Sequence, residues 1–108
     1  MKRGALVLAR AKGDFSSKPR PCVIVQSDLF NPTHQSVTVC PVTSQLVAVP
    51  LFRVALTPTN TNGLKKPSQV MVDKILSVRR ENIDTEIGTV DRETLLQIDH
   101  ALRTWLQL

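Results

Sequence analysis

The chain has 108 residues, of which 42% are hydrophobic and 21% charged, so we expect one globular domain over residues 1–108 and not a disordered chain. Its formal net charge of +5 suits either a polyanion-binding surface or an ordinary solvated surface. Two cysteines without CxxC spacing and two widely separated histidines exclude a disulfide scaffold and a structural zinc site, so we expect no metal and no cofactor.

Six short runs along the chain have the composition of β-strands. In chain order they are residues 5–11, 22–25, 36–40, 51–56, 69–75 and 87–90. The run 22–25 is apolar and β-branched, which is typical of a strand buried on both faces, whereas 36–40 alternates apolar and polar residues as a half-buried strand does. Turn-forming residues at 29–32 and 57–63 separate these runs.

Two prolines mark the edges of predicted strands. Pro41 should end the third strand or make it bulge, because proline cannot donate a ladder hydrogen bond, and this would expose Thr43 and Ser44. Residues 14–20 predict a polar loop that ends at Arg20, whose backbone is stiffened by a proline on each side.

The last segment changes to a helical period. Asp91 is a good N-cap, and Leu95, Ile98, Leu102 and Trp105 recur at helical spacing. The sequence therefore predicts a mainly β protein, a small twisted sheet or partly closed barrel of antiparallel strands, with one C-terminal amphipathic helix packed on it.

The charges are unevenly distributed along the chain. Residues 1–20 carry six basic residues and one acidic residue, and residues 65–80 carry five basic residues and one acidic residue. Residues 81–108 carry six acidic residues and two basic ones. If the two basic segments meet in the fold, they form a patch suited to nucleic acid.

No targeting or membrane segment is predicted. The N-terminal residues 1–10 have only five consecutive apolar residues, too few for the core of a signal peptide. The uncharged residues 29–52 are interrupted by prolines and polar side chains, which excludes a membrane helix. We therefore expect a cytoplasmic protein with reduced thiols and no membrane partner.

Taken singly, the candidate catalytic side chains are ambiguous. Exposed arginines like Arg20 are common, and a turn hydroxyl such as that of Thr43 often bonds its own backbone. His34 is the one loop side chain of a type that titrates near neutral pH, and an ordinary exposed histidine is the simpler interpretation. Asp73 beside Lys74 is expected to form a charge pair on the exposed face of a strand.

Two motifs become informative when they are taken together. Residues 18–31, KPRPCVIVQSDLFN, followed by residues 39–44, VCPVTS, resemble the MazF/PemK toxins of bacterial toxin–antitoxin modules. The resemblance continues through residues 63–64, 68–75 and 87–90 into the terminal helix, so it covers nearly the whole chain in order.

The resemblance implies a small SH3-like barrel of the CcdB/PemK type that forms a homodimer. It also implies a sequence-specific, metal-independent endoribonuclease that cleaves single-stranded mRNA. In that family the 2′-hydroxyl attacks the adjacent phosphorus and leaves a 2′,3′-cyclic phosphate and a 5′-hydroxyl. The expected partner is a cognate acidic antitoxin similar to MazE.

The resemblance also assigns site residues. The family's catalytic arginine and threonine fall on Arg20 and Thr43, and the strand aspartate of some members falls on Asp73. Ser44 and Ser16 are further candidates for catalysis or for positioning RNA. The candidate RNA-binding residues are Lys12, Lys18, Asn31, Lys65, Lys66 and Lys74.

The sequence departs from the family pattern at two places. Asp14 is the one acidic residue in the loop where many members have a glycine-rich acidic loop, and Met71 stands where some members have arginine. The residue that accepts the proton of the 2′-hydroxyl is therefore left open.

Two other functions are considered. A CcdB-like poison of DNA gyrase has the same fold and uses a tryptophan near its C-terminus, but Trp105 lies on the apolar helical stripe, where packing explains it better. A catalytically inactive module that binds RNA or antitoxin is the other. Four aromatic residues without a tyrosine make an RNA-stacking platform a poor explanation.

Overall fold

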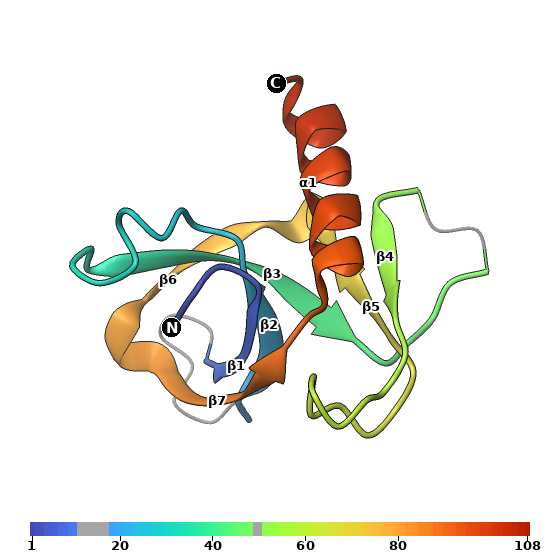
Figure 1. The fold of residues 1–108 in the computed structure, drawn as a ribbon, viewed down its shortest axis with the longest axis horizontal. Helices are drawn as coiled ribbons and strands as arrows, with labels where there is room; N and C mark the ends of the chain where they lie inside the picture. Colours follow the sequence, from blue (N-terminus) through green and yellow to red (C-terminus); the bar gives the residue numbers. More distant parts are fainter. Residues whose placement is uncertain (11–17, 49–50) are drawn as a thin grey trace.

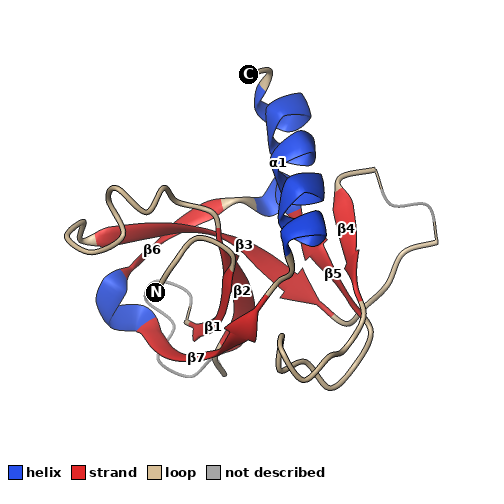
Figure 2. Ribbon diagram, viewed as in Figure 1, coloured by secondary structure: helices blue, strands red, loops and turns tan. Residues whose placement is uncertain are grey.

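A computed structural model describes residues 1–10, 18–48 and 51–108, which fold into an antiparallel sheet and one long helix (Figures 1 and 2). The elements are β1 (Ala5–Ala9), β2 (Arg20–Ile24), β3 (Ser36–Thr43), β4 (Arg53–Leu56), β5 (Ser68–Met71), the 3₁₀ turn η1 (Val72–Lys74), β6 (Leu76–Arg79), the 3₁₀ turn η2 (Arg80–Asn82), β7 (Ile83–Thr89) and α1 (Arg92–Leu106). The predicted fold class, mainly β with a C-terminal helix, is confirmed.

The sheet closes on itself because β3 has two partners on one edge. The sheet order is β4-β5-β3-β2-β1-β7, and β6 also pairs with β3. Residues Ser36–Val39 of β3 pair with β6, and Val42 and Thr43 pair with β5. Since β6 leads through η2 into β7, and β7 pairs with β1, these strands wrap into a small barrel, with β4 and β5 continuing beyond it (Figure 1).

Two apolar cores lie on the two faces of this sheet. The barrel core consists of Ala5, Val7, Ala9, Cys22, Ile24, Val37, Val39 and Val78. The helix core lies between the other face and α1 and includes Leu6, Val23, Cys40, Val42, Val54, Val70, Ile98 and Leu102. Alternate residues of β1 and β2 enter different cores, which explains why the run 22–25 is apolar throughout.

The terminal helix forms as predicted. The Asp91 carboxylate accepts a hydrogen bond from the Thr94 amide at 2.7 Å, so it caps the first turn. Ile98 and Leu102 are buried against the sheet, and burying a side chain of this size contributes about 1.5–3 kcal/mol. Capping and packing together fix where α1 begins and which face it buries.

The prediction for Pro41 was wrong, because β3 continues through this residue to Thr43. On one edge of β3 the ladder with β6 ends at Val39 and the ladder with β5 begins at Val42. The missing N–H of Pro41 falls in the interval between these two partners, where proline is tolerated.

Other strand boundaries also differ from the prediction. Arg20 is the first residue of β2 and not the last of a loop, and it pairs with Ala9, where β1 ends. The strand expected at 69–75 ends at Met71 and becomes η1. The sequence did not predict β6, and β7 begins at Ile83, four residues before its expected start at residue 87.

The turn at residues 59–63 presses against β7. A Cβ at Gly88 would lie 2.4 Å from the carbonyl oxygen of Thr61, closer than carbon and oxygen can approach. Gly63 has φ +72°, and a Cβ there would lie 2.2 Å from the carbonyl oxygen of Ile87. Glycine is therefore required at both positions for this turn to close against the strand.

Candidate functional site

The topology brings Arg20 and Thr43 to the same end of the sheet. The last paired residues of β2 and β3 at this end are Cys22 and Pro41. Arg20 lies two residues before that pair and Thr43 two residues after it, so strand alternation directs both side chains to the same face. The sheet therefore collects at one end the two residues assigned to catalysis.

This face is the one that turns away from the helix. In the β3–β5–β4 part of the sheet, the paired residues Val42, Val70 and Val54 enter the helix core. Their neighbours Thr43, Gln69 and Arg53 therefore point to the opposite face. We call this the site face, meaning the face of the sheet on which the side chains of Arg20, Thr43, Arg53 and Gln69 lie.

The Arg20 guanidinium is exposed, and among the described residues no carboxylate pairs with it. β2 and β5 are the two neighbours of β3 at this end, and both begin beside the end of β3. Lys18, Lys65 and Lys66 are exposed just before those two strands. We call Arg20 and these three lysines the basic rim; its field favours an anionic ligand beside Thr43.

Thr43 is half-buried, and its hydroxyl oxygen accepts a hydrogen bond from the Gln45 amide at 3.0 Å. The hydroxyl therefore does bond to the nearby backbone, as the simpler interpretation of Thr43 expects. A hydroxyl has one proton to donate and two acceptor sites, so occupation of one acceptor site leaves the proton available to another group. Thr43 can therefore donate a hydrogen bond to an anion at the site face.

The remaining candidate residues are not all brought to this place. Ser44 is exposed beside Thr43, whereas Ser16 and Lys12 lie outside the described residues. Asp73 and Lys74 are exposed in η1, past the far end of β5, because the partner of Thr43 is Gln69. The strand position expected for Asp73 was wrong, and the described residues show no ion pair between Asp73 and Lys74.

Comparison with known proteins identifies the family. The profile described as "PemK-like, MazF-like toxin of type II toxin-antitoxin system" matches residues 2–106. The chain belongs to this family. It is 37% identical over 106 residues to the "Probable endoribonuclease MazF" of Mycolicibacterium smegmatis, covering 98% of this chain and 96% of the relative. It is 34% identical to "Endoribonuclease MazF9" of Mycobacterium tuberculosis, covering 100% of this chain and 98% of the relative.

Solved structures share the MazF-like fold. An "Endoribonuclease in complex with its cognate antitoxin from Mycobacterial species" superposes with a TM-score of 0.82 at 24% identity, covering 100% of this chain and 96% of that chain. A MazE–MazF complex from Deinococcus radiodurans gives a TM-score of 0.83 at 21% identity, covering 100% of this chain and 97% of that chain. These similarities support the barrel fold predicted from the sequence.

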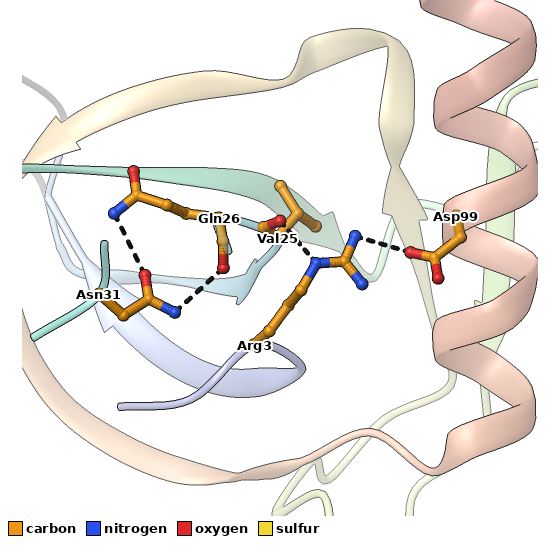
Figure 3. Close-up of polar contacts among 5 residues, drawn as sticks. All are labelled: Arg3, Val25, Gln26, Asn31 and Asp99. Carbon is orange, nitrogen blue, oxygen red and sulfur yellow. Dashed lines mark hydrogen bonds and ion pairs between the residues drawn. The ribbon is translucent and has the colours of Figure 1, made fainter. Parts of the chain in front are cut away.

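Asn31 serves the fold of this MazF-like chain. Its side chain is 2% exposed, and its amide nitrogen donates to the Gln26 carbonyl at 3.0 Å (Figure 3). The same nitrogen donates to the Asp28 carboxylate at 3.0 Å. Its amide oxygen accepts from the Gln26 side chain at 3.2 Å. The amide is buried and occupied by these contacts, so Asn31 supports the fold of this loop, and its binding to RNA stays an untested prediction.

The same loop is held from two sides. The Arg3 backbone N–H donates to the Asp28 carboxylate at 2.7 Å, and this hydrogen bond is the main reason that the pKa of Asp28 lies below its usual value. The Arg3 guanidinium pairs with Asp99 of α1 at 2.6 Å (Figure 3). Arg80 donates to the carbonyls of Asn31 and His34 from the other side. The QSDLFN motif therefore forms a loop that is fixed to the rest of the fold by hydrogen bonds on both sides.

Several basic residues of the two basic segments are thus occupied within the fold. Arg3 pairs with Asp99, Arg10 pairs with Asp84 at 3.3 Å, and Arg80 binds backbone carbonyls. Because these three arginines are engaged, the two basic segments contribute less free charge than their composition suggests. The four cations of the basic rim, in contrast, are exposed.

Neither histidine lies on the site face, and Cys22, two residues after Arg20 on the same face of β2, is buried. His34 lies before β3, at the opposite end from Thr43, beside an open hollow of about 1180 Å³. Cys22 and Cys40 lie in different cores, and burial raises the pKa of their thiols to about 11 and about 12. Among residues 1–10, 18–48 and 51–108, no three His, Cys, Asp or Glu side chains gather as metal ligands.

Trp105 packs within the fold of this MazF-like chain. Its ring lies 5.0 Å from that of Phe52, centroid to centroid, in a tilted arrangement, although 44% of the residue remains exposed. Packing was the interpretation favoured from the sequence, and the family match does not favour the CcdB-like alternative. In the described part of the chain, no helix is long and apolar enough to cross a membrane.

Proposed function

We propose that this chain is the toxin of a toxin–antitoxin pair and acts as an endoribonuclease on single-stranded mRNA at the site face. The observation that carries the proposal is that an exposed guanidinium, Arg20, and a hydroxyl with a free proton, Thr43, share one end and one face of the sheet. Relatives that this chain matches along nearly their whole length are named endoribonuclease.

The reaction needs no nucleophile from the protein, because the RNA supplies it. The 2′-oxygen gives up its proton and bonds to phosphorus, the bond from phosphorus to the 5′-oxygen breaks, and that oxygen takes up a proton. The products are a 2′,3′-cyclic phosphate and a 5′-hydroxyl, so neither a metal-bound water nor a cofactor is required.

Each site residue then has a distinct task. The Arg20 guanidinium binds two non-bridging oxygens in its planar fork and stabilises the negative charge that gathers on them in the transition state. The Thr43 hydroxyl donates a hydrogen bond to the same phosphate group or to the 2′-oxygen and orients it. The lysines of the basic rim attract the RNA backbone, and Ser44 lies next to the path that it takes.

The partners follow from charge and exposed apolar surface. A strongly basic rim favours an acidic antitoxin segment, similar to that of MazE, which blocks the site by occupying it. Trp105, Leu106 and Leu108 expose apolar area at the end of α1, and a second copy of the chain would cover such a surface. We place the homodimer in the cytoplasm, where mRNA is found, and light scattering at micromolar concentration tests the dimer.

The experiment that tests this function maps RNA ends. Purified protein is incubated with a long RNA of known sequence in excess EDTA, and 5′-hydroxyl and cyclic phosphate ends should appear at a recurring short sequence. Arg20→Ala should lower the cleavage rate by about 10²–10³, as loss of a preorganised donor does. Arg20→Lys should recover little, because an ammonium cannot form the bidentate contact.

Matched controls separate this chemistry from general charge effects. Arg92→Ala removes the same charge from an exposed position on α1 and should leave cleavage unchanged, as should His34→Ala. Thr43→Ser should retain much more activity than Thr43→Ala. An intact RNA together with inhibited gyrase supercoiling would overturn the proposal in favour of a gyrase poison, and RNA binding without cleavage would favour an inactive binding module.

A further inference from the structure

A buried glutamine lies beside the site threonine. Gln69 is the direct partner of Thr43 in the β3–β5 ladder, and it is 7% exposed although its side chain lies on the site face. Apolar residues fill most buried strand positions, and a buried amide destabilises the fold unless its hydrogen bonds are satisfied. The burial of Gln69 is therefore explained by the groups to which its amide is hydrogen-bonded.

The Gln69 amide binds both backbone groups of Val47. Its oxygen accepts from the Val47 N–H at 3.2 Å, and its nitrogen donates to the Val47 carbonyl at 3.3 Å. Val47 lies in the segment between β3 and β4, so this two-point contact holds a loop in the way that a neighbouring strand would hold it. The segment that follows Thr43 is thus fixed from within the sheet.

Arg53 extends the contact toward Thr43. One nitrogen of its guanidinium donates to the Gln69 side-chain oxygen at 3.1 Å and to the Gln45 carbonyl at 3.0 Å. The amide of the same Gln45 donates to the Thr43 hydroxyl at 3.0 Å. A continuous series of hydrogen bonds therefore runs from Gln69 through Arg53 and Gln45 to the hydroxyl of Thr43.

We propose that Gln69 and Arg53 are positioning residues that keep Thr43 as a hydrogen-bond donor toward RNA. With Gln45 held in place, its N–H occupies one acceptor site of the Thr43 hydroxyl, and the hydroxyl proton points away from the loop. Without this anchor the loop shifts and the hydroxyl loses its preferred orientation. This inference rests on the proposed function, because the role of Thr43 comes from it.

Strand alternation places Gln69 on one face of β5 but does not reveal its burial. Gln69 and Met71 alternate with the buried residues Ser68, Val70 and Val72, so an outward-facing position was visible, but its burial under a loop was not. A pattern of alternation cannot show which loop a polar side chain meets, since that contact joins residues 22 positions apart.

The test combines Gln69→Met with Thr43→Ala. Methionine keeps the length of the side chain and removes all of its amide hydrogen bonds. We expect Gln69→Met to lower kcat about 10-fold to 100-fold with KM changed less than about threefold, as a small misplacement of a catalytic group does. In the Thr43→Ala background the same substitution should change kcat by less than about twofold, because the group on which it acts is absent.

A control variant and a replacement variant complete this experiment. Gln97→Met, at an exposed position of α1, should change neither kcat nor KM. If Gln69→Met does not fold, Arg53→Met replaces it in the same cycle, and Arg53→Lys shows whether charge alone restores kcat. An undiminished effect in the Thr43→Ala background, or full activity of Gln69→Met, would overturn the inference.

Amide hydrogen exchange separates this inference from the proposed function. In the parent protein the Gln45 and Val47 amides should be protected, and Gln69→Met should speed their exchange at least about tenfold while exchange in α1 stays unchanged. A parent that cleaves no RNA refutes the proposed function alone. Unchanged exchange at both amides refutes the anchoring by Gln69 whether or not RNA is cleaved.

Discussion

Replacing Asn31 by alanine should cost stability and leave the chemistry intact. The substitution removes three side-chain hydrogen bonds, two to the Gln26 residue and one to the Asp28 carboxylate. A typical hydrogen bond contributes about 0.5–1.5 kcal/mol, and a buried polar group left without a partner costs about 1–3 kcal/mol. Since Asp28 is exposed and water can replace its lost donor, we expect a loss of about 2–4 kcal/mol in the free energy of unfolding.

Urea unfolding followed by circular dichroism measures this loss, and the m-value should stay the same because the exposed area does not change. The Tm should fall by about 10–20 °C for a chain of this length. Asn60→Ala makes the same change at an exposed turn position and should stay within about 0.5 kcal/mol of the parent. At a temperature where Asn31→Ala is folded, its kcat/KM on RNA should match that of the parent. An unchanged stability combined with weak RNA binding would refute the structural role of Asn31.

Four further outcomes follow from the structure. Cys22 and Cys40, whose pKa burial raises to about 11 and about 12, should react with Ellman's reagent at pH 8 only after urea unfolds the protein, and rapid reaction of the native protein would contradict their burial. The pKa of Asp28 is lowered by folding, so its stabilising effect is present above the unfolded value of about 4 and is lost as the pH falls through the folded value. Asp28→Asn should therefore reduce the pH dependence of unfolding in that acid range, and an unaltered acid titration would speak against this. Gly88→Ala should destabilise the fold by about 1–3 kcal/mol, measured in urea, because its Cβ would overlap the Thr61 carbonyl. The four cations of the basic rim predict that log affinity for single-stranded RNA falls against log salt with a slope of about −3 per site, and a flat response would show that they only solvate the surface.

Local patterns predicted those parts of the fold that depend on neighbouring residues. Asp91 and the helical period of Ile98 and Leu102 located α1 correctly, because capping and amphipathicity act within a few residues. The strand β6 was not predicted, since Val78 is its one buried residue and an alternating pattern cannot show in so short a run. Pro41 was misjudged because its tolerance depends on which strands pair with β3 on either side.

The candidate site, like the fold, was predicted only in part. The resemblance singled out Arg20 and Thr43, and the strand pairing brings them to one end of the sheet. It could not show that the Asn31 amide is buried and hydrogen-bonded within its loop, or that Gln69 binds Val47. These contacts depend on how loops return to the sheet. Polar residues that act through burial carry no local signal of their own.

The pairing of the first strand with the last bears on when a newly made chain becomes active. β1 leaves the ribosome early, but its partner β7 is synthesised only after all the other strands, so the barrel stays open along one side until then. Arg20 pairs with the end of β1, a strand that has β2 on one edge but lacks its neighbour on the other edge during most of synthesis. We expect an incomplete chain that stops before β7 to lack a formed site, so a chain still under synthesis should not cut the message from which it is made.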